Sequence, residues 1–167
     1  MKKSAVLLVF LIFLVLILSA ALLFIILNQP RGPAYFKVQR VVDGDTIILE
    51  NKETVRYLGI DTPELHHPSI GAECGGLEAS EKNQEILAGK RVRLVSDVTD
   101  RDSYGRLLRY VFTEDGTFVN YELIRDGYGQ VFEMQPDRML TNTFTQAQMD
   151  AKKEGSGLWK TCYNLTK

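Results

Sequence analysis

The sequence predicts an α+β fold, a small closed β-barrel of five strands with three helices, preceded by one apolar amino-terminal helix. Five short segments rich in β-branched residues, separated by turns containing Gly, Asp or Asn, are typical of strands. Three helical segments are interleaved with them, but the first three strands are contiguous, which favours a small barrel over alternating strand and helix units. An apolar run of 23 residues precedes all of these segments.

The amino-terminal run is long and apolar enough to predict a transmembrane helix. Residues 5–27 carry no charge, and as a helix they would extend roughly 34 Å at about 1.5 Å per residue, which crosses a bilayer. Lys2 and Lys3 precede the run, so residues 1–4 are expected in the cytoplasm and the folded part of the chain outside it. An uncleaved signal anchor in the cell membrane is expected. The alternative is a signal peptide cleaved near residues 19–21, which would release a secreted protein.

The rest of the chain divides into a linker, one domain and a short tail. Residues 28–34 contain two prolines and a glycine and are typical of a linker. The domain is expected over residues 35–162, a length that suits one globular unit, and residues 163–167 form the tail. The folded part is expected to be a monomer, and the amino-terminal helix is expected to bind the membrane.

The charge of the folded part excludes a strongly basic surface. Two of the 20 basic residues, Lys2 and Lys3, lie in the first segment, so residues 31–167 carry 18 basic and 21 acidic residues, a net charge of −3. No overall positive field therefore attracts nucleic acid. A phosphate ligand would have to be bound by a local group of cations or by a metal ion.

The expected elements follow one another with clear end signals. The expected strands are Phe36–Val42, Thr46–Glu50, Thr54–Leu58, Arg91–Ser96 and Leu107–Phe112. The expected helices are Gly76–Leu87, Phe118–Arg125 and Thr143–Lys153. Each helix is followed by a glycine that can end it, at Gly89, Gly127 and Gly155. In the first helix, Leu77, Ser80, Gln84 and Leu87 lie near one face.

Five charged residues gather between positions 43 and 64. Asp43 and Asp45 flank the glycine of a tight turn between the first two strands, and Arg56 lies within the third strand. Asp61 and Glu64 follow the third strand, and the proline between them restricts the preceding residue to an extended conformation. If the strands are neighbours, one cation could contact two of the carboxylates. The simpler alternative is an ordinary hairpin turn beside a solvated strand face.

Two further residue pairs could in principle bind a metal or form a disulfide. His66 and His67 are adjacent, but neighbouring side chains point apart in an extended chain and no cysteine or histidine lies at zinc-site spacing, so a surface loop is expected. Cys74 and Cys162 are the only cysteines. They could form one disulfide in an oxidising compartment, or remain two independent thiols.

Five ordered motifs together resemble the thermonuclease family, the staphylococcal nuclease-like domains. They are VVDGDT at residues 41–46, the strand carrying Arg56, GIDTPE at 59–64, SYGR at 103–106 and VNYELIRDG at 119–127. The resemblance runs from Phe36 to about Trp159. It implies an OB-fold barrel with three helices and calcium-dependent hydrolysis of phosphodiester bonds in DNA and RNA, an endonuclease activity that leaves 3′-phosphate ends.

The resemblance also implies a calcium site. Asp45 and Asp61 would bind Ca²⁺ through their carboxylates, and Thr62 would bind it through its main-chain carbonyl. Such oxygen ligands suit this ion. Asp43 would lie close behind them.

The remaining roles implied by the resemblance fall on four residues. Glu64 would hold or deprotonate the attacking water. Arg56 and Arg106 would bind the phosphate from two sides and stabilise the charge that grows on its oxygens in the transition state. Lysine would do this less well than arginine. Tyr104 would line the nucleotide pocket.

Two departures from the family pattern predict weaker substrate binding. Ser103 stands where some members have a lysine, and Gln130–Gln135 lacks the tyrosines that stack on a base. Phe132 is the expected substitute. With a net charge of −3 as well, substrate affinity is expected to be lower, and activity to fall as salt rises.

Two other functions compete with catalysis. A noncatalytic OB-fold module that binds nucleic acid or protein should have lost Asp45, Arg56, Glu64 or Arg106, and none is replaced. A calcium-stabilised interaction domain would explain the acids but would give the two arginines no role. A nuclease is therefore the expected function.

Overall fold

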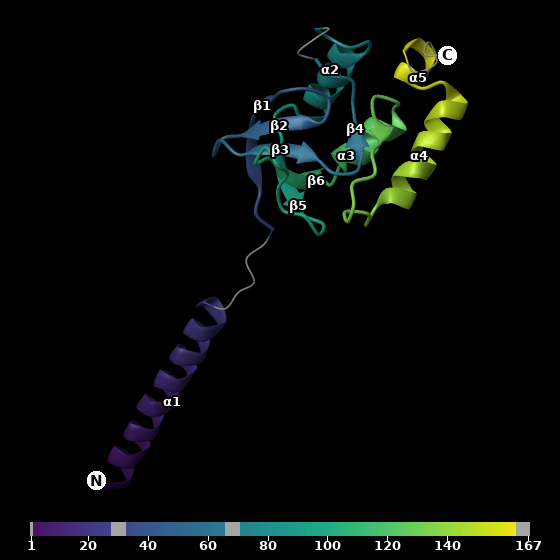
Figure 1. The fold of residues 1–167 in the computed structure, drawn as a ribbon. Coiled ribbons are helices and arrows are strands. Elements are labelled where there is room, and N and C mark those ends of the chain that lie inside the picture. Colours follow the sequence, from purple (N-terminus) through teal and green to yellow (C-terminus); the bar gives the residue numbers. More distant parts are fainter. Residues whose placement is uncertain (1, 28–32, 66–70, 163–167) are drawn as a thin grey trace. The chain divides into compact units, whose positions relative to one another are not determined.

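The computed structural model describes residues 2–27, 33–65 and 71–162, with side chains from Leu11 onward. The chain divides into two units, residues 1–33 and 34–167 (Figure 1). The first unit contains α1 (Lys2–Leu27), which covers the predicted apolar segment. Within the described residues, no helix is long and apolar enough to cross a membrane, so the predicted transmembrane helix is not found there. His66 and His67 lie outside the described residues.

Five strands of the second unit close into the predicted barrel, in the order β1, β2, β3, β6, β5. Their bounds are β1 (Phe36–Val41), β2 (Thr46–Leu49), β3 (Thr54–Tyr57), β5 (Arg91–Val95) and β6 (Leu107–Thr113). β1 and β5 close the barrel, with Phe36 opposite Val92. All neighbouring strands are antiparallel except β3 and β6, which are parallel.

The turn between β1 and β2 is tightly packed around Gly44. The Val42 N–H donates to the carbonyl of Thr46 at 2.9 Å, and the Asp45 N–H donates to Asp43 Oδ1 at 3.1 Å. A side chain on Gly44 would place its Cβ 2.5 Å from Thr62 Oγ1. The turn therefore needs glycine because the chain at Thr62 lies directly against it.

The helices cover the barrel, and one more is present than predicted. They are α2 (Gly76–Leu87), α3 (Val119–Arg125), α4 (Thr141–Glu154) and α5 (Leu158–Thr161). α3 packs against both α2 and α4 (Figure 1). Two strands of two residues each, β4 (Ile60–Asp61) and β7 (Gln130–Val131), pair with each other outside the barrel sheet. Neither strand was predicted. These elements span only two to four residues, too short for a hydrophobic period to show.

The residues noted on one face of α2 are not all buried. Ser80 and Leu87 are buried, but Leu77 is 54% exposed and Gln84 is exposed. Asn83 is fully buried instead. A polar side chain can be buried at this position because its hydrogen bonds are satisfied inside the domain.

Asn83 ties α2 to the barrel through two hydrogen bonds. Its side-chain oxygen accepts from the Tyr57 hydroxyl at 3.0 Å, and its amide nitrogen donates to the main-chain carbonyl of Asp43 at 3.1 Å. All three residues are buried. Through these buried hydrogen bonds, α2 fixes the position of the turn that contains Asp43.

The carboxy-terminal helix is tied to the start of α2. α4 ends at Gly155 in the left-handed conformation, as predicted, and Leu158 and Trp159 then pack into the domain, with 3% and 5% exposed. Cys74 and Cys162 form a disulfide with a Cα–Cα distance of 5.7 Å. α5 is thereby linked covalently to the chain just before α2.

Candidate active site

The fold brings four of the five clustered charges together, and the fifth, Asp43, lies near enough on the β1–β2 turn to interact with Arg56 and Glu64. Asp45 ends the β1–β2 turn, and the β2–β3 ladder places Thr46 opposite Arg56. Asp61 is the last residue of β4, and Glu64 follows three residues later. Residues that are up to 19 positions apart in the sequence thus meet because the strands that carry them are neighbours.

Asp45 is a buried carboxylate whose two oxygens are both satisfied. Its residue is 0% exposed. Oδ2 accepts from the Thr62 N–H at 2.9 Å, and Oδ1 accepts from the Thr46 hydroxyl at 3.1 Å and forms an ion pair with Arg56. A buried charge of this kind is stable only when it is paired and hydrogen-bonded. Asp45 therefore holds the chain at Thr62 against the barrel.

Arg56 lies between two carboxylates. Its Nη1 pairs with Asp45 Oδ1, and its Nη2 donates to Asp61 Oδ1 at 2.5 Å and to the Ile60 carbonyl at 3.4 Å. The residue is only 8% exposed, so it is not part of a solvated strand face. The structure thus brings Asp45 and Asp61 together around a single positive charge, as the strand pattern predicted.

Asp43 and Glu64 are acids whose ionised forms are disfavoured. Burial raises the pKa of Asp43, against the opposing charges of Arg56 and Arg106 and hydrogen bonds from Thr46. Burial, and next the negative charge of Asp43, raise the pKa of Glu64. Burial is the larger physical cause in both cases, and for Glu64 the negative charges of the neighbouring acids add to it. An additional cation would stabilise the ionised forms.

Arg106 approaches the same cluster from the start of β6. Its charge acts on Asp43, and its guanidinium lies 5.5 Å from the centre of the Tyr104 ring. Asp102 Oδ2 accepts from Arg106 Nε at 2.6 Å, and Asp102 Oδ1 accepts from the Arg106 N–H at 2.9 Å. Tyr104 itself is 84% exposed. The turn therefore presents an arginine and an aromatic ring side by side at the surface.

Asp102 was missed in the sequence, although its type and place carried a signal. It lies four residues before Arg106 in a polar turn, where aspartate commonly accepts main-chain hydrogen bonds. Burial alone would raise the pKa of Asp102, but the hydrogen bonds and charge of Arg106 together outweigh burial and lower it. Asp102 thus orients Arg106 and stays ionised.

The residues predicted to bind calcium offer a suitable set of donors. Asp45 and Asp61 already share one positive charge, and Thr62, the residue after Asp61, is bound to Asp45 through its N–H. The Thr62 hydroxyl is buried and has no hydrogen-bond partner among the described residues. All available donors are oxygens, which a hard cation such as Ca²⁺ prefers. In the described part of the chain, no three Asp, Glu, His or Cys side chains could hold a metal, and the predicted set contains only two.

Glu73 is the other residue missed in the sequence. Its Oε2 accepts from the Glu64 N–H at 3.0 Å, and its own N–H donates to the Glu64 carbonyl at 2.9 Å. Sequence spacing gave no signal for this contact, because nine residues separate the two positions. Phe132, the expected substitute for a stacking tyrosine, is 45% exposed next to β7.

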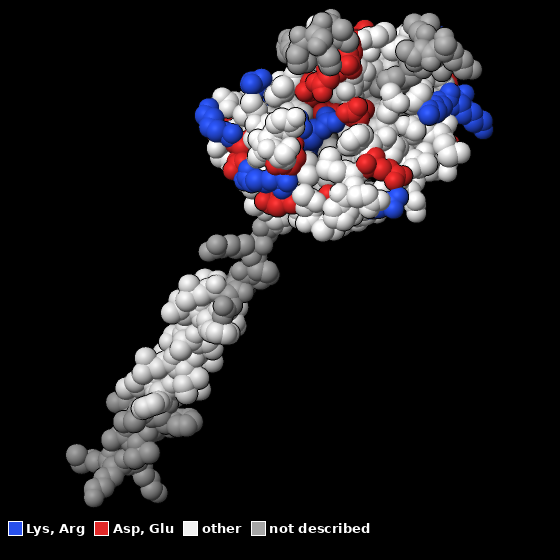
Figure 2. Space-filling view, in the orientation of Figure 1, with Lys and Arg blue, Asp and Glu red and all other residues white. Residues whose placement is uncertain are grey.

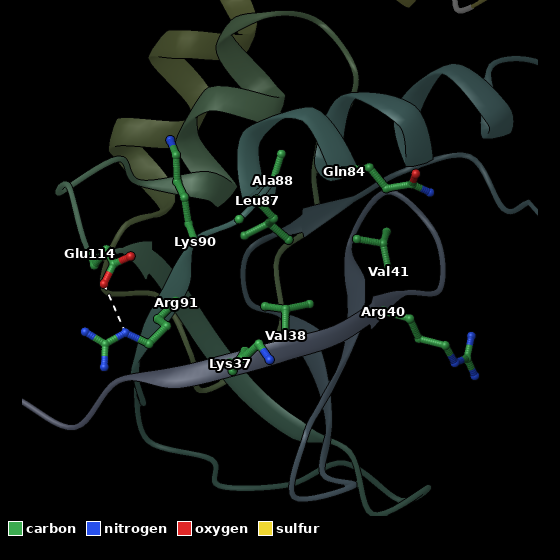
Figure 3. A pocket seen from close by; sticks show the side chains of 11 residues that line it. Lys37, Val38, Arg40, Val41, Gln84, Leu87, Ala88, Lys90, Arg91 and Glu114 are labelled. Carbon is green, nitrogen blue, oxygen red and sulfur yellow. Dashed lines mark hydrogen bonds and ion pairs between the residues drawn. The ribbon is translucent and has the colours of Figure 1, made fainter.

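A cavity of about 620 Å³ lies away from these acids, between β1, β5 and the end of α2, and its lining includes Lys37, Arg40, Lys90 and Arg91 (Figure 3). Three of these cations are neutralised, because Lys37 pairs with Glu50 at 2.6 Å, Lys90 with Asp115 at 2.8 Å and Arg91 with Glu114 at 3.0 Å. On the face seen in Figure 2, basic side chains likewise form separate patches and no continuous strip. Neither feature resembles a track for a polyanion.

The comparisons with known proteins agree on one family. Residues 54–161 match the family described as Staphylococcal nuclease homologue. The chain is 34% identical over 161 residues to a protein named thermonuclease from Staphylococcus intermedius. This match covers 87% of the present chain and 95% of that protein. It is 35% identical over 127 residues to the thermonuclease of Staphylococcus hyicus, covering 74% of this chain and 75% of that one.

A longer relative is similar over part of its length. The chain is 38% identical over 127 residues to the SPbeta prophage-derived endonuclease YokF of Bacillus subtilis (strain 168). This match covers 73% of the present chain but 43% of that protein. The match therefore leaves more than half of the longer protein outside it.

Proposed function

Because the chain belongs to the staphylococcal nuclease family, we propose that it is a nuclease that uses calcium to hydrolyse phosphodiester bonds in DNA and RNA. The observation that supports this best is the meeting of Asp45 and Asp61 at one guanidinium, with Glu64 beside them. Two buried carboxylates, Asp43 and Asp45, accompany one buried guanidinium, Arg56, and a structural role alone does not require this surplus of acids.

Asp45, Asp61 and the main-chain carbonyl of Thr62 would hold the calcium ion. A bound calcium ion supplies positive charge that offsets the charge of the phosphate as the nucleophile approaches. Asp45 is fixed for this by its bond to the Thr62 N–H, while Asp61 is exposed and can turn towards a ligand. Asp43 adds negative charge from behind.

Glu64 would act as the general base. Its carboxylate holds a water in line with the phosphorus and accepts a proton from it as the P–O bond forms. A raised pKa makes the carboxylate a better base near neutral pH than an ordinary exposed glutamate. The bond to the 5′-oxygen breaks, which leaves a 3′-phosphate end.

Arg56 and Arg106 would bind the phosphate from two sides. Each presents a planar guanidinium that can donate two hydrogen bonds to phosphate oxygens. Arg106 is oriented by Asp102, and Arg56 is buried among the acids. Donors that are already in place stabilise charge in the transition state without having to reorganise. Tyr104, beside Arg106, lies where it could contact the adjoining nucleotide.

The domain is also proposed to work outside the cytoplasm. The disulfide between Cys74 and Cys162 supports this, because such bonds form and persist in oxidising compartments. The charge pattern of the amino-terminal segment is consistent with export. Mass analysis of the amino-terminus of the mature protein, together with fractionation, tests whether the segment is retained or cleaved.

The direct test incubates the purified full chain with single-stranded DNA, duplex DNA and RNA, with calcium or with a chelator. Cleavage is expected only with calcium, and Glu64→Gln and Arg106→Ala should each lower it by roughly 100-fold or more. Cleavage that persists in the chelator would contradict the mechanism. Retained nucleic-acid binding without cleavage under any metal condition would favour the noncatalytic module.

A further inference from the structure

The segment Glu73–Gly76 is packed against the main chain of Glu64. The Glu64 N–H donates to Glu73 Oε2 at 3.0 Å, and the Glu64 carbonyl accepts from the Glu73 N–H at 2.9 Å. Both hydrogen-bonding groups of the Glu64 main chain are therefore engaged by one residue. Pro63, just before Glu64, has a fixed φ and limits the chain from the other side.

Two glycines allow this close approach. A Cβ on Gly76 would lie 2.5 Å from the Glu64 carbonyl oxygen, a distance that real Cβ atoms do not show. Gly75 has a φ of 87°, and a Cβ there would lie 2.5 Å from Leu158 Cδ1. The segment is thus wedged between Glu64 on one side and α5 on the other.

The disulfide joins the residue next to Glu73 to α5. Cys74 is bonded to Cys162, whose N–H donates to the Leu158 carbonyl at 2.8 Å. α5 is in turn held to the domain, because the Leu158 N–H donates to the Gly127 carbonyl at 3.0 Å. A continuous set of bonds therefore runs from the end of α3 through α5 and the disulfide to Glu73.

The same residues border the proposed metal site. A cavity of about 260 Å³ is lined by Asp61 and Thr62 on one side and by Glu73 and the disulfide on the other. The disulfide is thus one wall of the space next to the proposed calcium ligands, in addition to its place at the end of the domain. Movement of the disulfide would therefore change the shape of the space next to the proposed calcium ligands.

We propose that Glu73 is a positioning residue that fixes the main chain of Glu64, and that the Cys74–Cys162 disulfide holds Glu73 in place. This inference rests on the proposed nuclease function, in which Glu64 accepts the proton. Small displacements of a reacting group are costly, and about 1 Å can reduce a rate by roughly 100-fold. Glu73 contacts the main chain of Glu64 and needs no contact with substrate.

The test compares four variants of the full chain, all with saturating calcium and a linear DNA substrate. Glu73→Ala should lower kcat about 10-fold or more and leave KM within about twofold, because substrate binding is untouched. Glu73→Gln retains an oxygen acceptor for the Glu64 N–H and should recover most of kcat. The double variant Cys74→Ser with Cys162→Ser should lower kcat about threefold to tenfold. Glu81→Ala, an exposed acid of α2, is the matched control and should stay within twofold of the unmodified chain.

Amide hydrogen exchange at Glu64 provides a measurement that needs no activity. Protection should fall in Glu73→Ala and in the double cysteine variant, and it should be retained in Glu73→Gln. An unchanged kcat and protection in Glu73→Ala would overturn the proposal, and so would a Glu73→Gln variant as slow as Glu73→Ala. If the unmodified chain cleaves no nucleic acid, the proposed function fails, but the exchange result still decides whether Glu73 fixes Glu64.

Discussion

The two halves of the candidate active site are held in place in different ways. Asp45 and Arg56 belong to the barrel, where both are buried and lie in the β2–β3 ladder or at its edge. Asp61 and Glu64 lie on the chain that leaves β4, a strand of two residues. Glu64 is held by Glu73, next to the disulfide.

This difference determines at which residues a mutation can reduce activity without reducing stability. In the barrel half, the groups that would bind phosphate and metal also stabilise the fold, so activity and stability should be lost together. In the other half, a few contacts at the surface set the position of Glu64. Activity there should fall with little effect on the free energy of unfolding.

The largest effect is expected for Arg56→Ala. The change leaves the buried carboxylate of Asp45 without its ion pair, which should cost about 3–5 kcal/mol in the free energy of unfolding and abolish cleavage. Urea unfolding followed by circular dichroism measures the first effect. The control is Arg101→Ala, whose exposed pair with Glu53 should contribute no more than about 1 kcal/mol. Equal unfolding midpoints for Arg56→Ala and the unmodified chain would refute the structural role of Arg56.

Arg106→Ala is expected to separate activity from stability. Its side chain is 34% exposed, and its partner Asp102 also accepts two main-chain N–H bonds that the variant keeps, so unfolding should change by no more than about 1 kcal/mol. Loss of a preorganised donor should lower kcat by roughly 100- to 1000-fold. Steady-state cleavage and thermal unfolding are measured on the same preparation, with Arg138→Ala, an exposed pair with Glu133, as control. A drop in stability as large as that of Arg56→Ala would show that Arg106 also stabilises the fold.

Gly76→Ala is expected to have an intermediate effect on the other half of the site. The new Cβ would meet the Glu64 carbonyl at 2.5 Å and push Glu64 out of position, so kcat should fall about 10-fold. Gly129→Ala is a close control, because its Cβ would lie at an ordinary 3.5 Å from the Asp61 carbonyl and from Thr62. Cleavage rates and hydrogen exchange at Glu64 should change in the first variant and stay nearly constant in the second. Equal rates in both variants would mean that the Glu64 main chain tolerates displacement.

The smallest expected effect is a dependence of stability on pH. The raised pKa of Glu64 means that its ionised form is less stable in the folded state than in the unfolded state. As pH rises through the ordinary glutamate value of 4.5, the unmodified chain should lose stability relative to Glu64→Gln, and at lower pH the two should converge. Thermal unfolding across this range, in the presence of a chelator, measures the difference. A Glu64→Gln variant that is less stable than the unmodified chain at neutral pH would reverse the sign.

Much of the barrel could be predicted from the sequence because its strands carry strong local signals. β-branched segments with glycine and aspartate turns defined all five strands, and the helix-ending glycines defined three helices. The elements that were not predicted are β4, β7 and α5. They are set by tertiary contacts, such as the burial of Leu158 and Trp159, and not by local periodicity.

The meeting of the charged residues could be predicted from the sequence, but not the contacts that support them. The motifs identified Asp45, Arg56 and Glu64, and strand pairing brought the first two together. Burial of Arg56 could not be predicted, because alternation along a strand does not say which side another segment covers. Glu73 is proposed to act only through its hydrogen bonds to the Glu64 main chain, so no pattern of catalytic residues includes it.

The parallel pairing of β3 and β6 has a consequence for how the protein folds. Arg56 lies opposite Leu108, and Arg106 lies just before that position, so the two arginines meet only when strands distant in sequence have paired. Such long-range pairing is among the slower events in folding, because the intervening chain must first be ordered. A nascent or unfolded chain therefore contains all the acids of the site, but its two arginines are not yet positioned so that both can face one phosphate. Under the proposed function, the ability to cut nucleic acid is therefore acquired only when the barrel closes.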